Sequence, residues 1–287
     1  MKIKYLTDSA INAFIDSALK EDIGDGDHST LAAIPEDLEQ EARLLIKGDG
    51  VIAGLDLAQM IFHRFDQDLQ VELLKKDGEW VTEGEVGLTV KGRARSILST
   101  ERLVLNCMQR MSGVATYTRK MTDLIKHTNT QLLDTRKTAP NFRICEKWAV
   151  KIGGAVNHRF GLYDMVMLKD NHNDYAGGIT QAVEATKKYL AEKGKDLKIE
   201  VETRNLNEVK EALEVGGVDV IMLDNMLPST MKEAIALING QCKTEASGGV
   251  TEKNIKEIAE TGVDFISVGA LTHSYSSLDI SLKAVKQ

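Results

Sequence analysis

The residues best suited to chemistry in this chain lie in a cationic stretch near its middle. Residues 131–169 hold seven lysines and arginines and three acidic residues, a local positive excess in a chain whose formal net charge is −7. The basic residues of this stretch are Arg136, Lys137, Arg143, Lys147, Lys151, Arg159 and Lys169, and His158 lies among them. A compact positive patch on an acidic protein favours a small anionic ligand, because nucleic-acid binding usually needs a broad basic surface.

Short apolar runs between residues 131 and 268 predict the strands that position this stretch. Each run is followed by a helical pattern, such as the apolar face formed by Leu206, Val209 and Leu213. The runs end at Arg136, Lys169, Glu202, Asp224, Ser247 and Gly269. Strands that alternate with helices indicate a parallel sheet. Since no Gly-x-Gly-x-x-Gly sequence opens a helix, we expect a closed or nearly closed (β/α) barrel rather than a doubly wound sheet.

The carboxyl ends of the strands carry the active site in such barrels, so these six side chains should converge on one mouth. Glu202 and Asp224 could be solvated acids. Opposite Lys169 and Arg136, however, they are better interpreted as ligands of Mg²⁺ or of sugar hydroxyls.

Two glycine-containing strand ends predict phosphate-binding loops. Ser247-Gly248-Gly249 precedes a helix that we expect to begin near Thr251, and Gly269-Ala270 ends the next strand. Glycines also make plain turns, but backbone N–H groups in such loops can hold an anion.

The first part of the chain differs from this pattern and predicts a separate α+β domain. We expect helices at 11–19 and 55–65, a strand at 42–47, a glycine-punctuated strand meander, and a long helix at 97–125 interrupted near Ser112-Gly113. The domains are then 1–113, with 272–287 packing back on it, and 114–271. The acidic run EDIGDGD lacks the terminal bidentate acid of a calcium loop, so we interpret it as a loop or helix cap.

Composition excludes several classes of protein. With 43% hydrophobic residues and three prolines, the chain should be globular and ordered. A pI near 5.5 argues against nucleic-acid or anionic-membrane binding, and no apolar stretch is long enough to span a membrane. Three widely spaced cysteines support neither a disulfide framework nor a zinc ribbon. We therefore expect a cytoplasmic protein with reduced thiols.

The sequence resembles the quinolinate phosphoribosyltransferase family (nicotinate-nucleotide pyrophosphorylases, carboxylating) along nearly its whole length. The resemblance is carried by EDIGDGD, STERLVLNCMQRMSGVAT, DTRKTAP, GGAVNHRFGLYDMVMLKDNH, VIMLDNM, EASGGV and GVDFISVGALTHS. It implies an N-terminal open-faced α+β sandwich and an incomplete (β/α) barrel of about six or seven parallel strands. It also implies a homo-oligomer, a dimer or a dimer-based hexamer, in which a second subunit completes the active site.

The resemblance implies roles for particular residues as well. The catalytic set is Lys137, Lys169, Glu202 and Asp224, and the cationic substrate pocket is Arg136, Lys137, His158, Arg159 and Lys169. Arg102 is implied to reach the pocket across the subunit interface. Glu202 and Asp224 are implied to contact the ribose and its Mg²⁺, directly or indirectly. Ser247, Gly248, Gly249, Gly269 and Ala270 are implied to bind phosphate. No organic cofactor is implied.

The activity implied is transfer of a phosphoribosyl group from phosphoribosyl pyrophosphate to quinolinate, with decarboxylation to nicotinate mononucleotide. Two alternatives remain open at this point. One is the molybdenum-associated homologue of the same family, which uses a different acceptor. The other is a non-catalytic sensor of a pyridine carboxylate or sugar phosphate. Retention of the full cationic set disfavours the first alternative, and retention of Glu202 and Asp224 disfavours the second.

Overall fold

The computed structural model describes residues 4–285, which form two compact units. Among these residues, the first unit takes 4–119, 137–154 and 270–285, and the second takes 120–136 and 155–269. The chain therefore passes between the units several times, and its carboxyl-terminal segment belongs to the same unit as its amino-terminal one.

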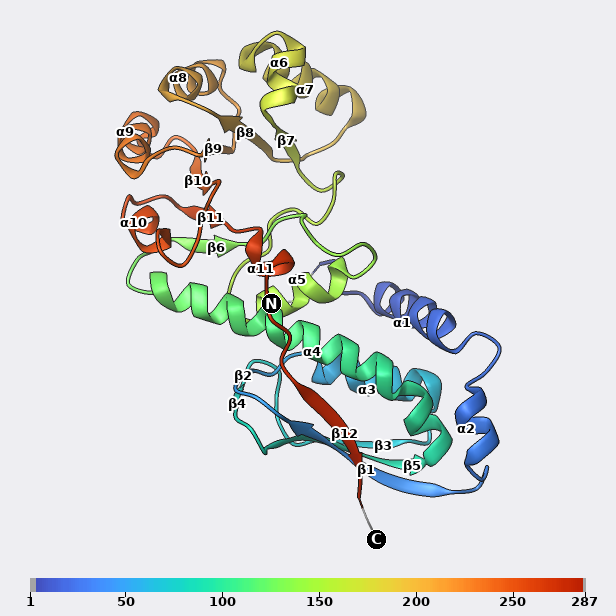
Figure 1. Cartoon of the computed structure of the whole chain (residues 1–287). Coiled ribbons are helices and arrows are strands. Elements are labelled where there is room, and N and C mark those ends of the chain that lie inside the picture. Colours follow the sequence, from blue (N-terminus) through green and yellow to red (C-terminus); the bar gives the residue numbers. More distant parts are fainter. Residues whose placement is uncertain (1–3, 286–287) are drawn as a thin grey trace. The chain divides into compact units, whose positions relative to one another are not determined.

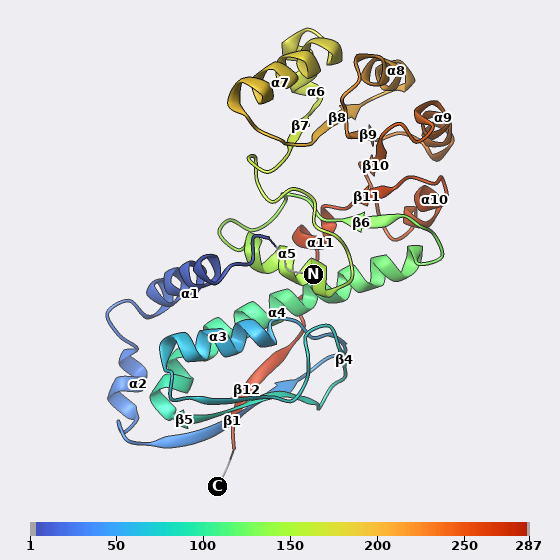
Figure 2. The ribbon, with the colours of Figure 1, turned by 180° about the vertical axis from the view of Figure 1, so that it is seen from behind.

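The first unit is built on a four-stranded antiparallel sheet with the order β12-β1-β5-β3. Its strands are β1 (Glu39–Ile46), β3 (Gln70–Leu73), β5 (Val86–Arg93) and β12 (Ile280–Ala284), and a separate pair is formed by β2 (Gly50–Val51) and β4 (Trp80–Val81). Along β1, every second residue from Ala42 to Ile46 is buried, as expected of a strand with one covered face. Helix α3 (Leu55–Phe65) and helix α4 (Ala94–Ile125) lie over one face of the sheet (Figures 1 and 2). The expected α+β sandwich is confirmed.

The other helices of the first unit are α1 (Asp8–Ile23), α2 (His28–Ala33), α5 (Arg143–Ile152) and α11 (Ala270–His273). Asp27 begins α2 as its N-cap, because its Oδ1 accepts the backbone N–H of Thr30 at 3.1 Å. The acidic run before this helix thus supplies a helix cap, as the sequence predicted.

Helix α4 is continuous, so the expected interruption near Ser112-Gly113 is wrong. Gly113 serves a close approach instead. A Cβ atom at this position would lie 2.3 Å from the carbonyl oxygen of Ser276 and 2.9 Å from the Tyr275 ring. Its lack of a side chain therefore lets the carboxyl-terminal segment run against α4. That contact is tertiary, and the local sequence of the helix does not reveal it.

The second unit contains a six-stranded parallel sheet with the order β6-β11-β10-β9-β8-β7. Its strands are β6 (Gln131–Leu133), β7 (Val166–Leu168), β8 (Ile199–Thr203), β9 (Val220–Asp224), β10 (Lys243–Ser247) and β11 (Phe265–Ser267). All five residues of β8 are buried, as are the first four of β9, which is typical of parallel strands covered on both faces. The expected parallel α/β architecture is confirmed.

The order of the strands describes an incomplete barrel. β6 and β7 are the first two strands of this sheet along the chain, yet they lie at its opposite edges. Between them in sequence, Val156 forms an isolated parallel bridge with Leu133, and its backbone N–H donates to the Leu132 carbonyl at 2.9 Å. This short segment stands where a seventh strand would lie. Among the described strands, β7 pairs only with β8, so hydrogen bonds do not close the ring.

The helices of the second unit are α6 (Asp170–Ala176), α7 (Ile179–Lys193), α8 (Leu206–Val215), α9 (Pro228–Ile238) and α10 (Ile255–Ala259). In Figure 1, α7, α8 and α9 follow one another along the outside of the sheet, and each turns buried apolar residues inward. Across residues 4–285, no helix is both long enough and apolar enough to span a bilayer.

Candidate active site

The predicted strand-end residues of the second unit lie at the carboxyl edge of its parallel sheet. Lys169 directly follows β7, and Glu202 is the penultimate residue of β8. Asp224 and Ser247 are the last residues of β9 and β10. Asp224 and Ser247 are register partners across neighbouring strands. Parallel register places such side chains on the same face, so the sequence rule that these ends converge holds for this part of the site.

Glu202, Lys169 and Asp224 form the acidic side of the site. The Lys169 Nζ lies 4.0 Å from Glu202 Oε2, and the Glu202 side chain is only 11% exposed. Burial raises the pKa of Glu202, and repulsion from Asp224 raises it further, whereas the Lys169 ammonium opposes both effects. Two neighbouring carboxylates, of which Lys169 contacts Glu202, carry negative charge that one lysine compensates only in part. Such a donor set fits a divalent cation or the hydroxyls of a sugar.

Asp224 is oriented by its neighbour Asn225, which the sequence analysis did not single out. Asn225 Nδ2 donates to Asp224 Oδ2 at 2.7 Å, and its backbone N–H donates to the Ser247 carbonyl at 2.9 Å. Gly248 packs directly on this amide, since a Cβ there would lie 2.2 Å from Asn225 Oδ1. Gly248 and Gly249 also have φ angles of +94° and +61°, which favour glycine. The loop therefore needs both glycines for its shape.

The helix after this loop begins later than expected. Helix α10 starts at Ile255 instead of near Thr251. The Asn254 side chain forms a local turn, in which its Oδ1 accepts the Thr251 N–H at 2.7 Å and its Nδ2 donates to the Gly249 carbonyl at 3.0 Å. The prediction of a helix terminus immediately behind the glycines is wrong, and any phosphate contact at Ser247–Gly249 must come from the loop itself.

Arg159 and Arg136 form the cationic side of the site. In the part of the chain that the structure describes, Arg159 donates only to neutral acceptors, the Met165 carbonyl at 3.2 Å and the Met167 Sδ at 3.4 Å. Burial lowers the pKa of the Arg159 guanidinium and the nearby Arg136 lowers it further, whereas Glu200 and Asp164 oppose these effects in part. Two guanidiniums that repel each other in a partly desolvated place favour a bound anion, and their planar forks suit a carboxylate.

His158 lies beside these arginines in a buried cluster with two glutamates. Its Nε2 lies 2.9 Å from Glu200 Oε2 and 3.5 Å from Glu245 Oε2. The imidazole is 7% exposed and each carboxylate 1%. Burial alone would lower the pKa of His158, but the hydrogen bonds to Glu200 and then Glu245 outweigh it and raise the pKa from 6.5 to about 9. The ring is therefore cationic at neutral pH.

Asp134 fixes the loop that carries His158 and Arg159. Its Oδ1 accepts the backbone N–H of His158 at 2.8 Å, and its Oδ2 accepts Asn157 Nδ2 at 2.7 Å. Asp134 is fully buried, so these charge-assisted hydrogen bonds are strong and well ordered. The position of His158 is thus set by contacts at both its backbone and its ring.

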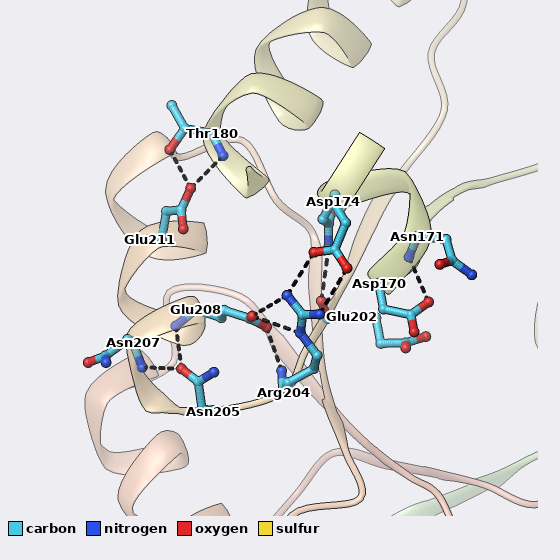
Figure 3. Close-up of polar contacts among 11 residues, drawn as sticks. Asp170, Asn171, Asp174, Thr180, Glu202, Arg204, Asn205, Asn207, Glu208 and Glu211 are labelled. Carbon is cyan, nitrogen blue, oxygen red and sulfur yellow. Dashed lines mark hydrogen bonds and ion pairs between the residues drawn. The ribbon is translucent and has the colours of Figure 1, made fainter. Parts of the chain in front are cut away.

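Helix α6 carries Lys169 at its amino end and is anchored at two points. The buried Asn173 donates through Nδ2 to the Glu202 carbonyl at 3.2 Å. Arg204 binds Asp174 of this helix through both terminal nitrogens, at 3.0 and 2.9 Å, and also binds Glu208 through Nε at 2.8 Å (Figure 3). In Figure 3 this network lies beside Glu202. These contacts tie the Lys169 side of the mouth to the end of β8.

Three predicted site residues belong to the first unit. Arg102 is exposed on α4, Ala270 begins α11, and Lys137 is exposed at the start of the segment that leads to α5. Lys137 lines a cavity of about 520 Å³, together with Arg110, Thr138, Ala139, Glu146, Thr272, His273, Tyr275 and Ser277. In this cavity, burial raises the pKa of Glu146 to about 7.

Sequence reasoning missed the buried partners of the site. Glu200 and Glu245 each lie two residues before a predicted site residue on the same strand, Glu202 and Ser247 respectively. Because strand side chains alternate between faces, a spacing of two puts each pair on one face. The two-residue spacing could therefore have indicated that Glu200 and Glu245 face the site, although it does not identify His158 as their partner.

The chain matches family models over most of its length. "Quinolinate phosphoribosyl transferase, N-terminal domain" matches residues 27–112, and "Quinolinate phosphoribosyl transferase, C-terminal domain" matches residues 114–283. Together they cover both the sandwich strands and the parallel sheet.

Relatives and solved structures agree with this match. A "Nicotinate-nucleotide pyrophosphorylase [carboxylating], chloroplastic" from Oryza sativa subsp. japonica is 51% identical over 95% of this chain and 77% of its own length. A "Probable nicotinate-nucleotide pyrophosphorylase [carboxylating]" from Bacillus subtilis (strain 168) is 43% identical over 91% and 89%. The crystal structure of NadC from Streptococcus pyogenes superposes with a TM-score of 0.90 at 37% identity, covering 98% of this chain and 99% of that one. With two family models matched nearly end to end, this chain belongs to the quinolinate phosphoribosyltransferase family.

Proposed function

We propose that this protein transfers the phosphoribosyl group of phosphoribosyl pyrophosphate to quinolinate, with loss of CO₂. The products are nicotinate mononucleotide, pyrophosphate and CO₂, so the enzyme is a decarboxylating pentosyltransferase of NAD biosynthesis. The observation that carries the proposal is the separation of charge at the mouth of the second unit. Arg159 and the buried His158 imidazolium supply the cationic side, whereas Glu202 and Asp224 supply the acidic side.

The cationic side suits the acceptor. Quinolinate carries two adjacent carboxylates, and the arginine forks can bind carboxylate oxygens in pairs. Arg136, Arg159 and His158 would hold the ring so that its nitrogen faces the anomeric carbon of the donor. Holding two reactants in this orientation removes much of the entropic part of the barrier.

The acidic side suits the donor. The ring nitrogen forms a bond to the anomeric carbon while the bond from that carbon to pyrophosphate breaks. The ribose passes through a state that resembles an oxocarbenium ion, whose positive charge Glu202 and Asp224 can stabilise. Lys169 would bind the departing phosphates, and the backbones of Ser247, Gly248, Gly249 and Gly269 would receive the phosphoryl groups.

Decarboxylation follows from the charge on the ring. Once the nitrogen is alkylated, the pyridinium can accept the electron pair left when the bond from the ring to the 2-carboxylate breaks. A proton then replaces CO₂ at that carbon. The nearby cations favour the zwitterionic intermediate, so the reaction needs no organic cofactor.

Mg²⁺ fits the carboxylate pair. Burial and mutual repulsion raise the pKa of Glu202, which indicates negative charge that a divalent cation would compensate. Glu202 and Asp224 would hold the ion, directly or through water, and the ion would neutralise part of the charge of the leaving pyrophosphate.

The same proposal includes a homo-oligomer, a dimer or a dimer-based hexamer, in a cytoplasmic location. Arg102 is exposed on α4 and lies at none of the strand ends of the parallel sheet. We infer that it completes the pocket of a partner subunit, so that each active site draws on two chains.

A product assay tests the function. Purified protein should convert quinolinate, phosphoribosyl pyrophosphate and Mg²⁺ into nicotinate mononucleotide with equal amounts of CO₂ and pyrophosphate, and should not use nicotinate as acceptor. Turnover of nicotinate at a comparable rate would contradict the proposal, because the 2-carboxylate would then have no role.

A further inference from the structure

The cluster of His158, Glu200 and Glu245 brings together three buried ionisable side chains from three segments of the second unit. Glu200 lies on β8, Glu245 on β10, and His158 on the loop that follows the Val156 bridge. Both glutamates direct one oxygen toward His158 Nε2, at 2.9 and 3.5 Å. Among the described residues, Glu200 Oε1 and Glu245 Oε1 are buried without a hydrogen-bond partner. His158 is thus the cationic group that lies nearest both buried carboxylates, and Arg159 adds a favourable charge near Glu200.

We propose that Glu200 and Glu245 are positioning residues, which fix the His158 ring and keep it cationic so that it binds the acceptor together with Arg136 and Arg159. This inference rests on the proposed function, because it assigns a third positive charge to the side of the pocket that receives quinolinate. Neither glutamate needs to touch the substrate, since both act through His158.

The geometry explains why the ring is fixed. An ionised carboxylate only accepts hydrogen bonds, so Nε2 carries the proton at this contact when Glu200 is ionised. Burial raises the pKa of Glu200, and the hydrogen bond from His158 opposes that effect. The backbone N–H of His158 is held at the same time by Asp134 Oδ1 at 2.8 Å. With the backbone and one ring nitrogen held, the imidazole has little freedom to turn.

The surrounding charges favour the cationic ring. Glu200 and Glu245 face it from β8 and β10, and Asp134 lies behind its backbone, whereas Arg159 follows it on the same loop and Arg136 lies near Arg159. Burial opposes the charge, but the two glutamates outweigh burial and raise the pKa of His158 to about 9. Without them, burial would dominate and the pKa would fall below the ordinary value.

A bound metal ion is the competing explanation for such a cluster. The ligand atoms of the three side chains lie within 4.8 Å of one another, and an imidazole with two carboxylates is a possible ligand set. A metal ion would need the Nε2 lone pair and would displace its proton. Protonation of the ring and metal binding at Nε2 therefore exclude each other, and one experiment can separate them.

The test compares Glu200→Gln, Glu245→Gln and the double variant with the wild-type protein. Glutamine keeps the shape and removes the charge. Glu260→Gln is the matched control, because Glu260 Oε1 lies 3.2 Å from His127 Nε2 in an exposed pair. The first measurement is NMR titration of histidine ring nitrogens in the free proteins, with His158 identified among the six histidines by its loss in His158→Gln. The second measurement is the KM for each substrate as a function of pH.

We expect His158 to titrate near 9 in the wild type and below 6.5 in the double variant. Near pH 8, the KM for quinolinate should rise about 10-fold or more in the double variant, because a charge-assisted contact to a carboxylate is lost. The difference should shrink as the pH falls through the His158 pKa measured in the double variant, because the imidazole then regains its proton. The KM for phosphoribosyl pyrophosphate should stay within about twofold, because other residues bind the donor.

Three results would overturn the inference. The first is a wild-type His158 that titrates at or below 6.5. The second is an equal, pH-independent rise of both KM values, which would mark Glu200 and Glu245 as residues that merely support the fold. The third is stoichiometric binding of Zn²⁺ or Mn²⁺ that is lost in Glu245→Gln, which would assign the cluster to a metal ion. If wild-type protein fails to turn over quinolinate, the proposed function falls, and the NMR titration still decides the charge of His158.

Discussion

Replacing Arg159 by alanine should weaken quinolinate binding selectively. The guanidinium is half-buried next to Arg136, and its hydrogen bonds in the described structure go to a carbonyl and a thioether, so a bound carboxylate would be its one charged acceptor in the pocket. Asp224→Asn is the contrasting change. It removes one negative charge from the donor side and keeps an oxygen for the Asn225 amide.

The magnitude follows from the lost contact. A hydrogen bond to a charged group contributes about 1.5–3 kcal/mol, which corresponds to a rise in Kd of about 10- to 150-fold. Loss of Arg159 also removes its repulsion with Arg136, which lowers the pKa of Arg159 in the wild type. A bound carboxylate would relieve this repulsion in the wild type, so its absence adds to the lost hydrogen bond and we expect the upper half of the range. Asp224→Asn should leave quinolinate binding within about twofold, yet lower turnover and raise the Mg²⁺ requirement.

Calorimetric titration of quinolinate into each variant measures the difference directly. Arg43→Ala is the control for loss of an arginine, because Arg43 is an exposed residue of β1 that pairs with Glu41. Equal weakening of quinolinate binding in Asp224→Asn and Arg159→Ala would refute the division of the pocket into an acceptor side and a donor side.

Three further predictions concern assembly, positioning and stability. The variants Arg102→Ala and Lys169→Ala should each be nearly inactive alone. When the two are mixed under subunit exchange, activity should return, because a mixed dimer would have one intact site. Heterodimers that form without activity would contradict the shared site. Asp174→Asn should raise the KM for phosphoribosyl pyrophosphate about two- to fivefold by releasing α6 from Arg204, whereas Glu208→Gln, which leaves the link to α6 intact, should not. Burial raises the pKa of Asp77 from 3.8 to about 6, so the folded protein holds the Asp77 proton more tightly than the unfolded chain does. The stability that this proton contributes is full below about pH 4 and is lost as the pH rises through about 6. Urea titration near pH 8 should therefore find Asp77→Asn more stable by about 1–2 kcal/mol, and equal stability of the two proteins there would contradict the assignment.

The architecture could be predicted because it depends on local pattern. Short apolar runs that end in polar residues located the strands of the parallel sheet, and the expected helix at 55–65 agrees with α3. The residues at the strand ends, Lys169, Glu202, Asp224 and Ser247, could be named for the same reason. Each one occupies a position that the strand pattern itself defines.

The remaining features depend on contacts between distant segments. Gly113 lies inside the continuous helix α4 and permits the close approach of Ser276, and the helix after Gly249 begins late because Asn254 forms a turn. Glu200 and Glu245 look like polar interruptions of apolar strands until His158 is placed between them. Such partners are set by the tertiary fold, so periodicity and spacing alone do not assign them.

The activity proposed for this protein joins phosphoribose to quinolinate and removes the 2-carboxylate in one active site. The most direct measurement uses quinolinate labelled with ¹³C in the 2-carboxylate, with phosphoribosyl pyrophosphate and Mg²⁺. We predict that labelled CO₂ and unlabelled nicotinate mononucleotide appear in equal amounts and at equal rates. A nucleotide product that retains the label, or equal turnover of nicotinate, would contradict the account.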